Sequence, residues 1–125
     1  MEWQFTSDRP IYIQLSDQIV SGILTGKYKM GEKLPSVREF AEIAAVNPNT
    51  VQRALSELEA VGLIDNQRTT GKFVTQDEAR IAMAKTNKGE ILTIDFLKNM
   101  AGLGYTKKQS AEIVTEVASK EEENG

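Results

Sequence analysis

The chain contains no cysteine and no histidine. Without cysteine it can form neither disulfide bonds nor thiolate zinc sites, and without histidine it lacks the commonest metal ligand and general base. No uncharged apolar run is long enough to span a bilayer, and residues 1–7 lack the basic start and apolar core of a signal peptide. We therefore expect a cytoplasmic protein with no metal, no cofactor and no membrane partner.

The length of 125 residues suits one ordinary domain or a compact module with a helical appendage. The formal net charge of -3 argues against a nucleic-acid partner, because a protein that neutralises phosphates presents basic surface. The position of the charges weakens that argument. An acidic run, Glu121–Glu123, lies at the end of the sequence, and between residues 30 and 76 several basic residues are spaced so that a fold can bring them together: Lys33, Arg38, Arg53, Arg68 and Lys72.

Three helices are predicted in the first half of the chain. Residues 10–25 begin at a proline suited to a first turn and repeat an apolar residue every fourth position. Ser36 and Glu39 have the spacing of a capping box, which starts a second helix that reaches about residue 44. After a very short break, Asn47 caps a third helix with Pro48 in its first turn, and this helix runs to Gly62.

The rest of the chain is predicted as a hairpin followed by two helices. Residues 63–66 and 72–75 suit short strands joined by a turn at 67–71. A long helix follows from residue 78 to about 103, and a capping-box pattern opens a last helix, which should turn its apolar residues inward: Ile113, Val114 and Val117. The fold class is mainly α with a small β hairpin. We expect a winged helix-turn-helix domain at 1–76 and a two-helix C-terminal dimerisation region at 77–125.

The third predicted helix carries the residues that indicate function. At about 100° per residue, an apolar side containing Val51 and Leu55 separates from a polar side formed by Asn49, Gln52, Arg53 and Ser56. An ordinary solvated face would explain any amphipathic helix. This polar side, however, offers amide, hydroxyl and guanidinium groups and has no carboxylate before Glu57. Such groups pair with base edges and phosphates, and the helix N-terminus adds free amide donors.

Two further groups of donors surround that helix in the predicted fold. Arg38 lies in the first turn of the second helix, where a helix-turn-helix would hold it against the sugar-phosphate backbone. The predicted hairpin tip is rich in donors that reach phosphates or the adjacent minor groove, namely Arg68, Thr69, Thr70 and Lys72. Each group alone is equally consistent with a surface charge or a polar turn. Their combination is what favours DNA.

Several sequence runs resemble one known family. These are Leu34-Pro35-Ser36-Val37-Arg38-Glu39-Phe40-Ala41, Val46-Asn47-Pro48-Asn49-Thr50-Val51-Gln52-Arg53-Ala54-Leu55, Leu58-Glu59-Ala60-Val61-Gly62-Leu63-Ile64 and Gly71-Lys72-Phe73-Val74. Together with Pro10-Ile11-Tyr12 and Gly31 they resemble the DNA-binding domain of the GntR family over about residues 8–76. The Asn-Pro-Asn-Thr-Val run and the short helical C-terminal region resemble its YtrA subfamily. The resemblance implies a homodimeric winged helix on a palindromic operator, commonly a repressor of nearby transporter genes.

The resemblance also implies roles for single residues. Arg38 matches the DNA-contacting arginine of the run that begins Pro-Ser, and Asn49, Thr50 and Gln52 match recognition-helix contacts. Two positions depart from the family pattern: Pro48 stands where many members have an arginine, and the wing's paired glycines are reduced to Gly71. From residues and resemblance together, the predicted DNA-binding set is Ser36, Arg38, Asn49, Thr50, Gln52, Arg53, Arg68, Thr69, Thr70 and Lys72.

The long fourth helix is apolar on more than one side, which is expected if one side packs on the last helix and another on a second copy. The predicted dimerisation residues are Leu92, Phe96, Leu97, Met100 and Leu103. In the alternative arrangement, all of them pack on the chain's own winged domain.

The sequence therefore predicts a sequence-specific DNA-binding transcription regulator. A winged helix that binds an acidic protein partner is the alternative, and salt-dependent DNA affinity separates the two. An enzyme is the least favoured class, because the carboxylates lie on a helix without a histidine, a cysteine or a phosphate-binding loop. No residue indicates a small-molecule effector.

Overall fold

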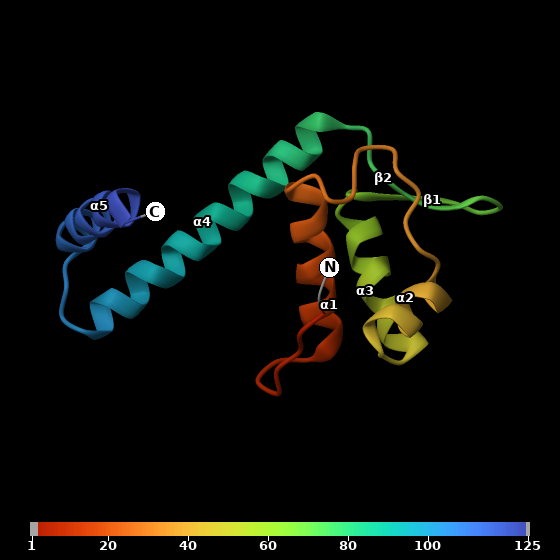
Figure 1. Cartoon of the computed structure of the whole chain (residues 1–125), viewed down its shortest axis with the longest axis horizontal. Coiled ribbons are helices and arrows are strands. Elements are labelled where there is room, and N and C mark those ends of the chain that lie inside the picture. Colours follow the sequence, from red (N-terminus) through yellow and green to blue (C-terminus); the bar gives the residue numbers. More distant parts are fainter. Residues whose placement is uncertain (1–2, 125) are drawn as a thin grey trace. The chain divides into compact units, whose positions relative to one another are not determined.

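A computed structural model describes residues 3–124 of the chain. Its elements, drawn in Figure 1, are α1 (Ile11–Leu24), α2 (Val37–Ala44), α3 (Pro48–Ala60), β1 (Ile64–Gln67), β2 (Gly71–Val74), α4 (Glu78–Gly102) and α5 (Lys107–Asn124). The described residues thus form helices and one two-stranded antiparallel hairpin, which confirms the predicted mainly α fold class. None of the described helices combines the length and the low charge that crossing a bilayer requires.

The chain forms two compact units, which divide after Lys85, within α4. The predicted boundary at 76/77 lies ahead of that helix. The first turns of α4 stay with the winged unit because Ile81 and Ala84 pack against its core and Arg80 lies over Gly62.

The winged unit is built around α3. Both α1 and α2 pack against α3, and the hairpin continues from its C-terminal end (Figure 1). Its core takes side chains from all of these elements, and the largest ones that are fully buried are Phe40, Leu15, Ile19, Leu55, Val51 and Val74. The predicted apolar faces of the three helices therefore meet in one interior.

Local sequence signals explain the short connection between α2 and α3. The backbone N–H of Glu39 donates to Ser36 Oγ at 3.1 Å, and the Glu39 carboxylate accepts from the Ser36 backbone N–H at 3.0 Å, so the predicted capping box is present. Ala45 ends α2 in the left-handed region with a φ of 55°. Asn47 Oδ1 then caps α3 by accepting from the Asn49 backbone N–H at 2.8 Å. The two helices are thus only a few residues apart.

The hairpin pairs β1 with β2 from Ile64 opposite Val74 to Gln67 opposite Gly71, which leaves residues 68–70 as its tip. Gly71 has a φ of 119°, which an L side chain rarely adopts, so the glycine at this end of the turn is required. The segment before α2 adds to the sheet: the Leu34 N–H donates to the Lys72 carbonyl at 2.8 Å. The wing is thereby tied to the start of α2.

The C-terminal unit consists of the rest of α4 and of α5. α5 begins with the predicted capping box, in which Thr106 and Gln109 exchange hydrogen bonds of 2.9 and 3.1 Å. Ser110 is the only buried residue among those described from Thr86 onward. Of the α5 residues predicted to turn inward, Ile113 is half-buried, but the prediction was wrong for Val114 and Val117, which are exposed in the single chain. Two helices alone offer too little surface to cover them.

Candidate nucleic-acid interface

The exposed side of α3 carries the polar residues that the sequence predicts there. Val51 and Leu55 are fully buried, whereas Asn49, Gln52 and Arg53 are exposed. Thr50, at the edge of this side, is half-buried. The protein's own chain therefore leaves this side of α3 open to a partner, as recognition by a major-groove helix requires.

Near its middle, the polar side of α3 is held by side-chain contacts. Gln52 Nε2 donates to Ser56 Oγ at 3.3 Å, one turn along the helix. The Arg53 guanidinium lies over the Tyr12 ring of α1, with Cζ 3.8 Å from the ring centroid, and its Nη2 donates to the Tyr12 hydroxyl at 3.1 Å. Sequence reasoning missed Tyr12, since 41 residues separate the pair and no local pattern links them.

Arg38 projects from the first turn of α2. Its side chain is 90% exposed, and its nearest charge is the Glu42 carboxylate at 3.9 Å, an exposed pair with little hold on the guanidinium. Beside it, the capping box orients Glu39. Hydrogen bonds from the backbone N–H and the side chain of Ser36, together with the charge of Lys33, keep the pKa of Glu39 below its ordinary value. Ser36 itself is exposed at the start of α2.

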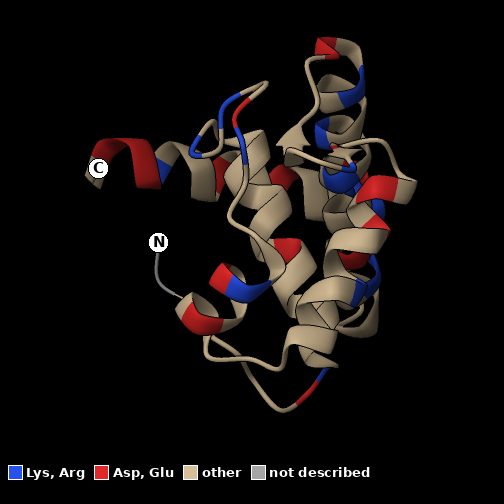
Figure 2. Ribbon diagram, turned by 90° about the vertical axis from the view of Figure 1, so that its right-hand side faces the viewer, with Lys and Arg blue, Asp and Glu red and all other residues tan. Residues whose placement is uncertain are grey.

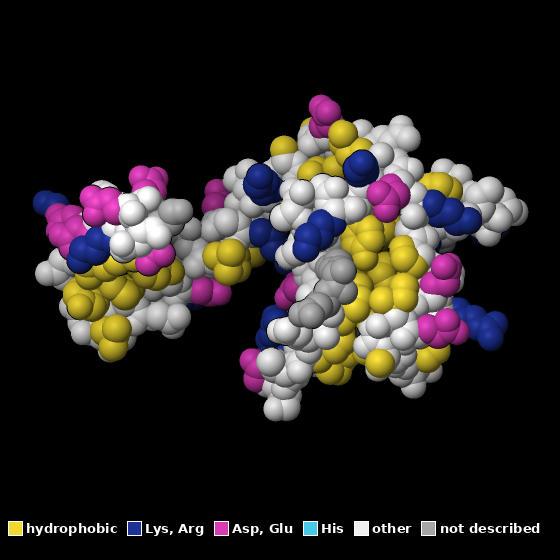
Figure 3. Space-filling model, in the orientation of Figure 1, with side chains coloured by type: hydrophobic (Ala, Val, Ile, Leu, Met, Phe, Trp, Pro, Cys, Tyr) yellow, Lys and Arg dark blue, Asp and Glu magenta, His cyan; other side chains and the backbone are white. Residues whose placement is uncertain are grey.

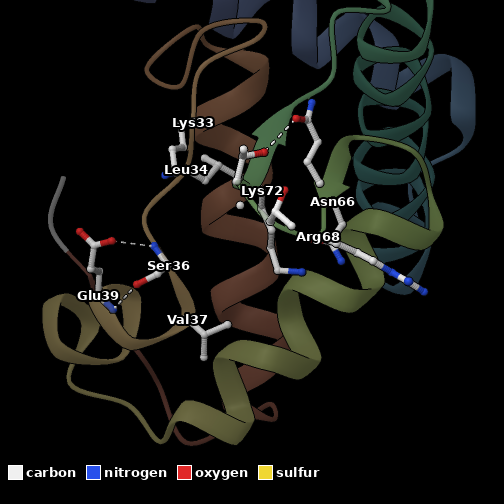
Figure 4. Close-up of a pocket in the computed structure, with 12 residues that line it drawn as sticks. Lys33, Leu34, Ser36, Val37, Glu39, Asn66, Arg68 and Lys72 are labelled. Atoms are coloured by element: carbon white, nitrogen blue, oxygen red, sulfur yellow. Dashed lines mark hydrogen bonds between the residues drawn. The ribbon is translucent and has the colours of Figure 1, made fainter.

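A groove of about 380 Å³ separates the start of α2 from the wing. Figure 4 shows Lys33 and Ser36 on one side of it and the hairpin on the other, with Arg68 extending away from Ser36. Thr69 and Thr70 complete the exposed tip, and the Thr70 hydroxyl donates to Gln67 Oε1 at 2.9 Å. Exposed donors therefore border both sides of this groove.

Lys72 lies in the second strand, as its place at the start of the predicted strand 72–75 implies, and not at the tip with the donors among which it was counted. It is part of β2, its side chain is only 14% exposed, and its ammonium forms an ion pair with Glu59 of α3. Lys33, which was not in the predicted set, also lines the groove and is exposed, with Cε 3.0 Å from where a Cβ on Gly71 would stand. Of the two lysines that line the groove, the exposed one thus comes from the segment before α2.

Charges of both signs mix on the winged unit, as Figure 2 shows, and acidic residues gather at the end of α5. Among residues 3–124, no group of three acidic side chains is arranged to hold a metal ion. The exposed hydrogen-bond donors on α2, α3 and the wing are therefore the feature of this surface that indicates a ligand.

Comparison with known proteins decides what this arrangement belongs to. The model of the family "Bacterial regulatory proteins, gntR family" matches residues 11–74, which span α1 to the end of the wing. The chain belongs to the GntR family. Among curated relatives, the uncharacterized HTH-type transcriptional regulator YhcF of Bacillus subtilis is 38% identical, with 90% of this chain and 93% of YhcF covered. The HTH-type transcriptional repressor YtrA of the same species is 38% identical over 69% of this chain and 71% of its own.

Solved structures agree with this assignment. A GntR family transcriptional regulator from Listeria monocytogenes has a TM-score of 0.83 and 40% identity, covering 90% of this chain and 98% of its own. The DNA-binding domain of AraR in complex with operator ORX1 has a TM-score of 0.56 and 28% identity, covering 60% of this chain and 96% of that domain. This GntR family member thus has the winged fold of transcriptional regulators, and no enzyme family is indicated.

Proposed function

We propose that this GntR family member is a homodimeric repressor that binds a palindromic operator through α3. The observation that carries the proposal is the exposed polar side of α3, with Asn49, Gln52 and Arg53 presented together on a helix anchored by buried residues. An α-helix fits the major groove of B-DNA, where amide groups read adenine edges and a guanidinium pairs with a guanine edge or with a phosphate beside the groove. No carboxylate lies on this side before Glu57.

The flanking donors have positioning roles in this proposal. Arg38, almost fully exposed, contacts a phosphate beside the groove, and the hydroxyl of Ser36 lies next to it at the start of α2. The wing tip formed by Arg68, Thr69 and Thr70 reaches the neighbouring phosphates or the minor groove. Lys72 contributes chiefly through its ion pair with Glu59, which fixes the base of the wing to α3.

A second copy of the chain is the proposed occupant of the apolar surface on the C-terminal unit. Leu92 and Leu103 are 70% and 75% exposed, while Phe96, Leu97 and Met100 are half-buried. Hydrophobic side chains gather on one side of this unit in Figure 3, and a groove of about 490 Å³ there is lined mainly by apolar residues of α4 and α5. Pairing across a two-fold axis covers this surface and presents two α3 helices to two half-sites.

Repression is proposed because the curated relative YtrA is named a repressor, and control of nearby transporter genes follows the family resemblance alone. In this proposal the winged part binds DNA and the two C-terminal helices form the dimer. We place the functional division near the start of α4, at 76/77, although the first turns of α4 pack on the winged unit.

Selection of bound duplexes from random DNA tests the proposal. We expect an inverted repeat whose half-sites are about one DNA turn apart, with affinity that falls as salt rises. Arg53→Ala and Arg38→Ala should both weaken binding, and Lys120→Ala in α5 is the control that removes one positive charge from the C-terminal unit. A pure sample with no salt-dependent affinity for any duplex would overturn the proposal and favour a protein-interaction module.

A further inference from the structure

Tyr12 is the one aromatic residue of α1, and its ring holds the arginine of α3. The guanidinium of Arg53 stacks on that ring with Cζ 3.8 Å from the centroid, and Nη2 donates to the hydroxyl at 3.1 Å. Two contacts of different kinds on one side chain fix both the plane and the direction of the guanidinium. An exposed arginine without such contacts samples many rotamers.

The contact lies at the surface and not in the core. Arg53 is exposed and Tyr12 is half-buried, whereas the residues that pack α1 on α3 are fully buried, Leu15 and Leu55 among them. The cohesion of the two helices therefore does not depend on the Tyr12–Arg53 pair. One Nη2 hydrogen bond to Tyr12 uses one of the five N–H donors of Arg53, and the rest stay available to an acceptor that offers two oxygens, such as a phosphate.

We propose that Tyr12 is a positioning residue for DNA binding: it orders the guanidinium of Arg53 in advance so that its remaining donors meet a backbone phosphate at the edge of the major groove. The inference rests on the proposed function, since it specifies how one residue of the same surface acts. Ordering a long side chain before association removes that part of the entropy cost from the binding step. Tyr12 acts through Arg53 and need not touch DNA itself.

A double-mutant cycle in the full-length protein tests this, with the selected operator duplex as the probe. Tyr12→Leu keeps an apolar side chain on α1 and removes both contacts, and we expect about three- to tenfold weaker binding. Tyr12→Phe keeps the ring and removes the hydrogen bond, and should lose only about twofold. In the Arg53→Ala background, Tyr12→Leu should cause no further loss, because the residue on which Tyr12 acts is gone.

A second readout separates positioning from a general structural role. Arg53→Ala should reduce the slope of log affinity against log salt by about one, the change expected for one lost phosphate contact, whereas Tyr12→Leu keeps the guanidinium and should weaken binding with little change in that slope. Tyr28→Phe is the matched control, since it removes a tyrosine hydroxyl from the same unit without touching Arg53, and its affinity should equal that of the wild type.

The outcomes are distinguishable. If the wild type binds its operator and Tyr12→Leu weakens binding equally with and without Arg53, or lowers the salt slope by more than Arg53→Ala does, the positioning role is refuted while the proposed function stands. Full affinity in the Tyr12→Leu variant would refute it as well. If the wild type shows no salt-dependent DNA binding, the proposed function fails and the role of Tyr12 fails with it.

Discussion

Arg80, in the first turn of α4, lies directly over Gly62, just after the end of α3. Its Nη1 approaches the Gly62 carbonyl oxygen at 3.5 Å, and it would stand only 2.7 Å from a Cβ at that position. Gly62 has a φ of 80°, in the left-handed region. The backbone conformation therefore favours a glycine here, and a Cβ would in addition make the end of the Arg80 side chain shift.

Replacing this glycine should destabilise the winged unit. Gly62→Ala introduces left-handed strain and displaces Arg80, and we expect a loss of about 1–2 kcal/mol in the free energy of unfolding, measured by urea denaturation. Gly89→Ala is the matched control, because Gly89 lies within α4 with no atom near its Cβ position. That substitution should stabilise the helix by about 0.5–1 kcal/mol. Equal effects of the two changes would contradict the account.

The capping box of α2 makes a separate prediction about stability. Ser36→Ala removes the oxygen that accepts from the Glu39 backbone N–H at 3.1 Å, and a lost N-cap of this kind costs about 1 kcal/mol. Ser36→Thr keeps the acceptor and should retain most of the stability in the same denaturant titration. If alanine and threonine unfold at the same denaturant concentration, the cap does not stabilise α2.

The same box makes stability depend on pH. Hydrogen bonds from Ser36 and the charge of Lys33 lower the pKa of Glu39 from its ordinary 4.5. Near this pH, the Glu39 carboxyl therefore binds fewer protons in the folded state than in the unfolded state. Its stabilising contribution is fully present above about pH 4.5 and is lost as the pH falls through the lower, folded-state pKa. Glu39→Gln keeps the capping geometry but does not titrate, so its acid unfolding curve should be flatter than that of the wild type. Parallel curves would refute the assignment.

Arg38 should matter for DNA and not for folding. Its side chain is 90% exposed and its pair with Glu42 is long, so Arg38→Ala should leave the melting temperature unchanged. Loss of a phosphate contact should weaken operator binding by about tenfold, evenly across operator variants, and reduce the salt slope by about one. Fluorescence anisotropy at several salt concentrations measures both quantities. A loss confined to one operator base would show that Arg38 reads sequence instead.

The proposed dimer is tested at its most exposed apolar residues. Leu92→Asp places a charge on a side chain that is 70% exposed in one copy, so the single chain should still fold while pairing is lost. Sedimentation should show a monomer at concentrations where the wild type is a dimer. Val61→Asp, on an exposed apolar residue of the winged unit, should remain a dimer. A monomeric wild type, or a dimeric Leu92→Asp, would argue against this surface.

The elements of the winged unit were predictable because their signals are local. The Ser36–Glu39 and Asn47–Pro48 start signals, the every-fourth-residue repeat of α1 and the Gly71 turn all lie within a few residues of what they specify, and the structure confirms each. The predicted end of α3 at Gly62 was two residues late, since the helix ends at Ala60.

Contacts between distant residues were not predictable in the same way. The Tyr12–Arg53 stack and the Lys72–Glu59 pair join residues brought together only by packing, and no periodicity specifies which exposed side chains meet. The outcome for α5 has a different cause. Its apolar spacing predicts burial, but the pattern does not state whether the cover comes from the same chain, and in the single chain Val114 and Val117 are exposed.

The near absence of buried residues among those described after Thr86 has a consequence for how the proposed dimer forms in a growing cell. The winged unit encloses its own interior and can mature as soon as it is synthesised. In the proposed dimer, the two terminal helices bury their apolar residues only when a second copy binds, so the amount of paired protein would rise with the square of the protein concentration while monomers predominate. Occupancy of an operator with two half-sites should then rise more steeply than linearly with expression level. Little operator should be bound until the protein concentration is high enough for two copies to pair.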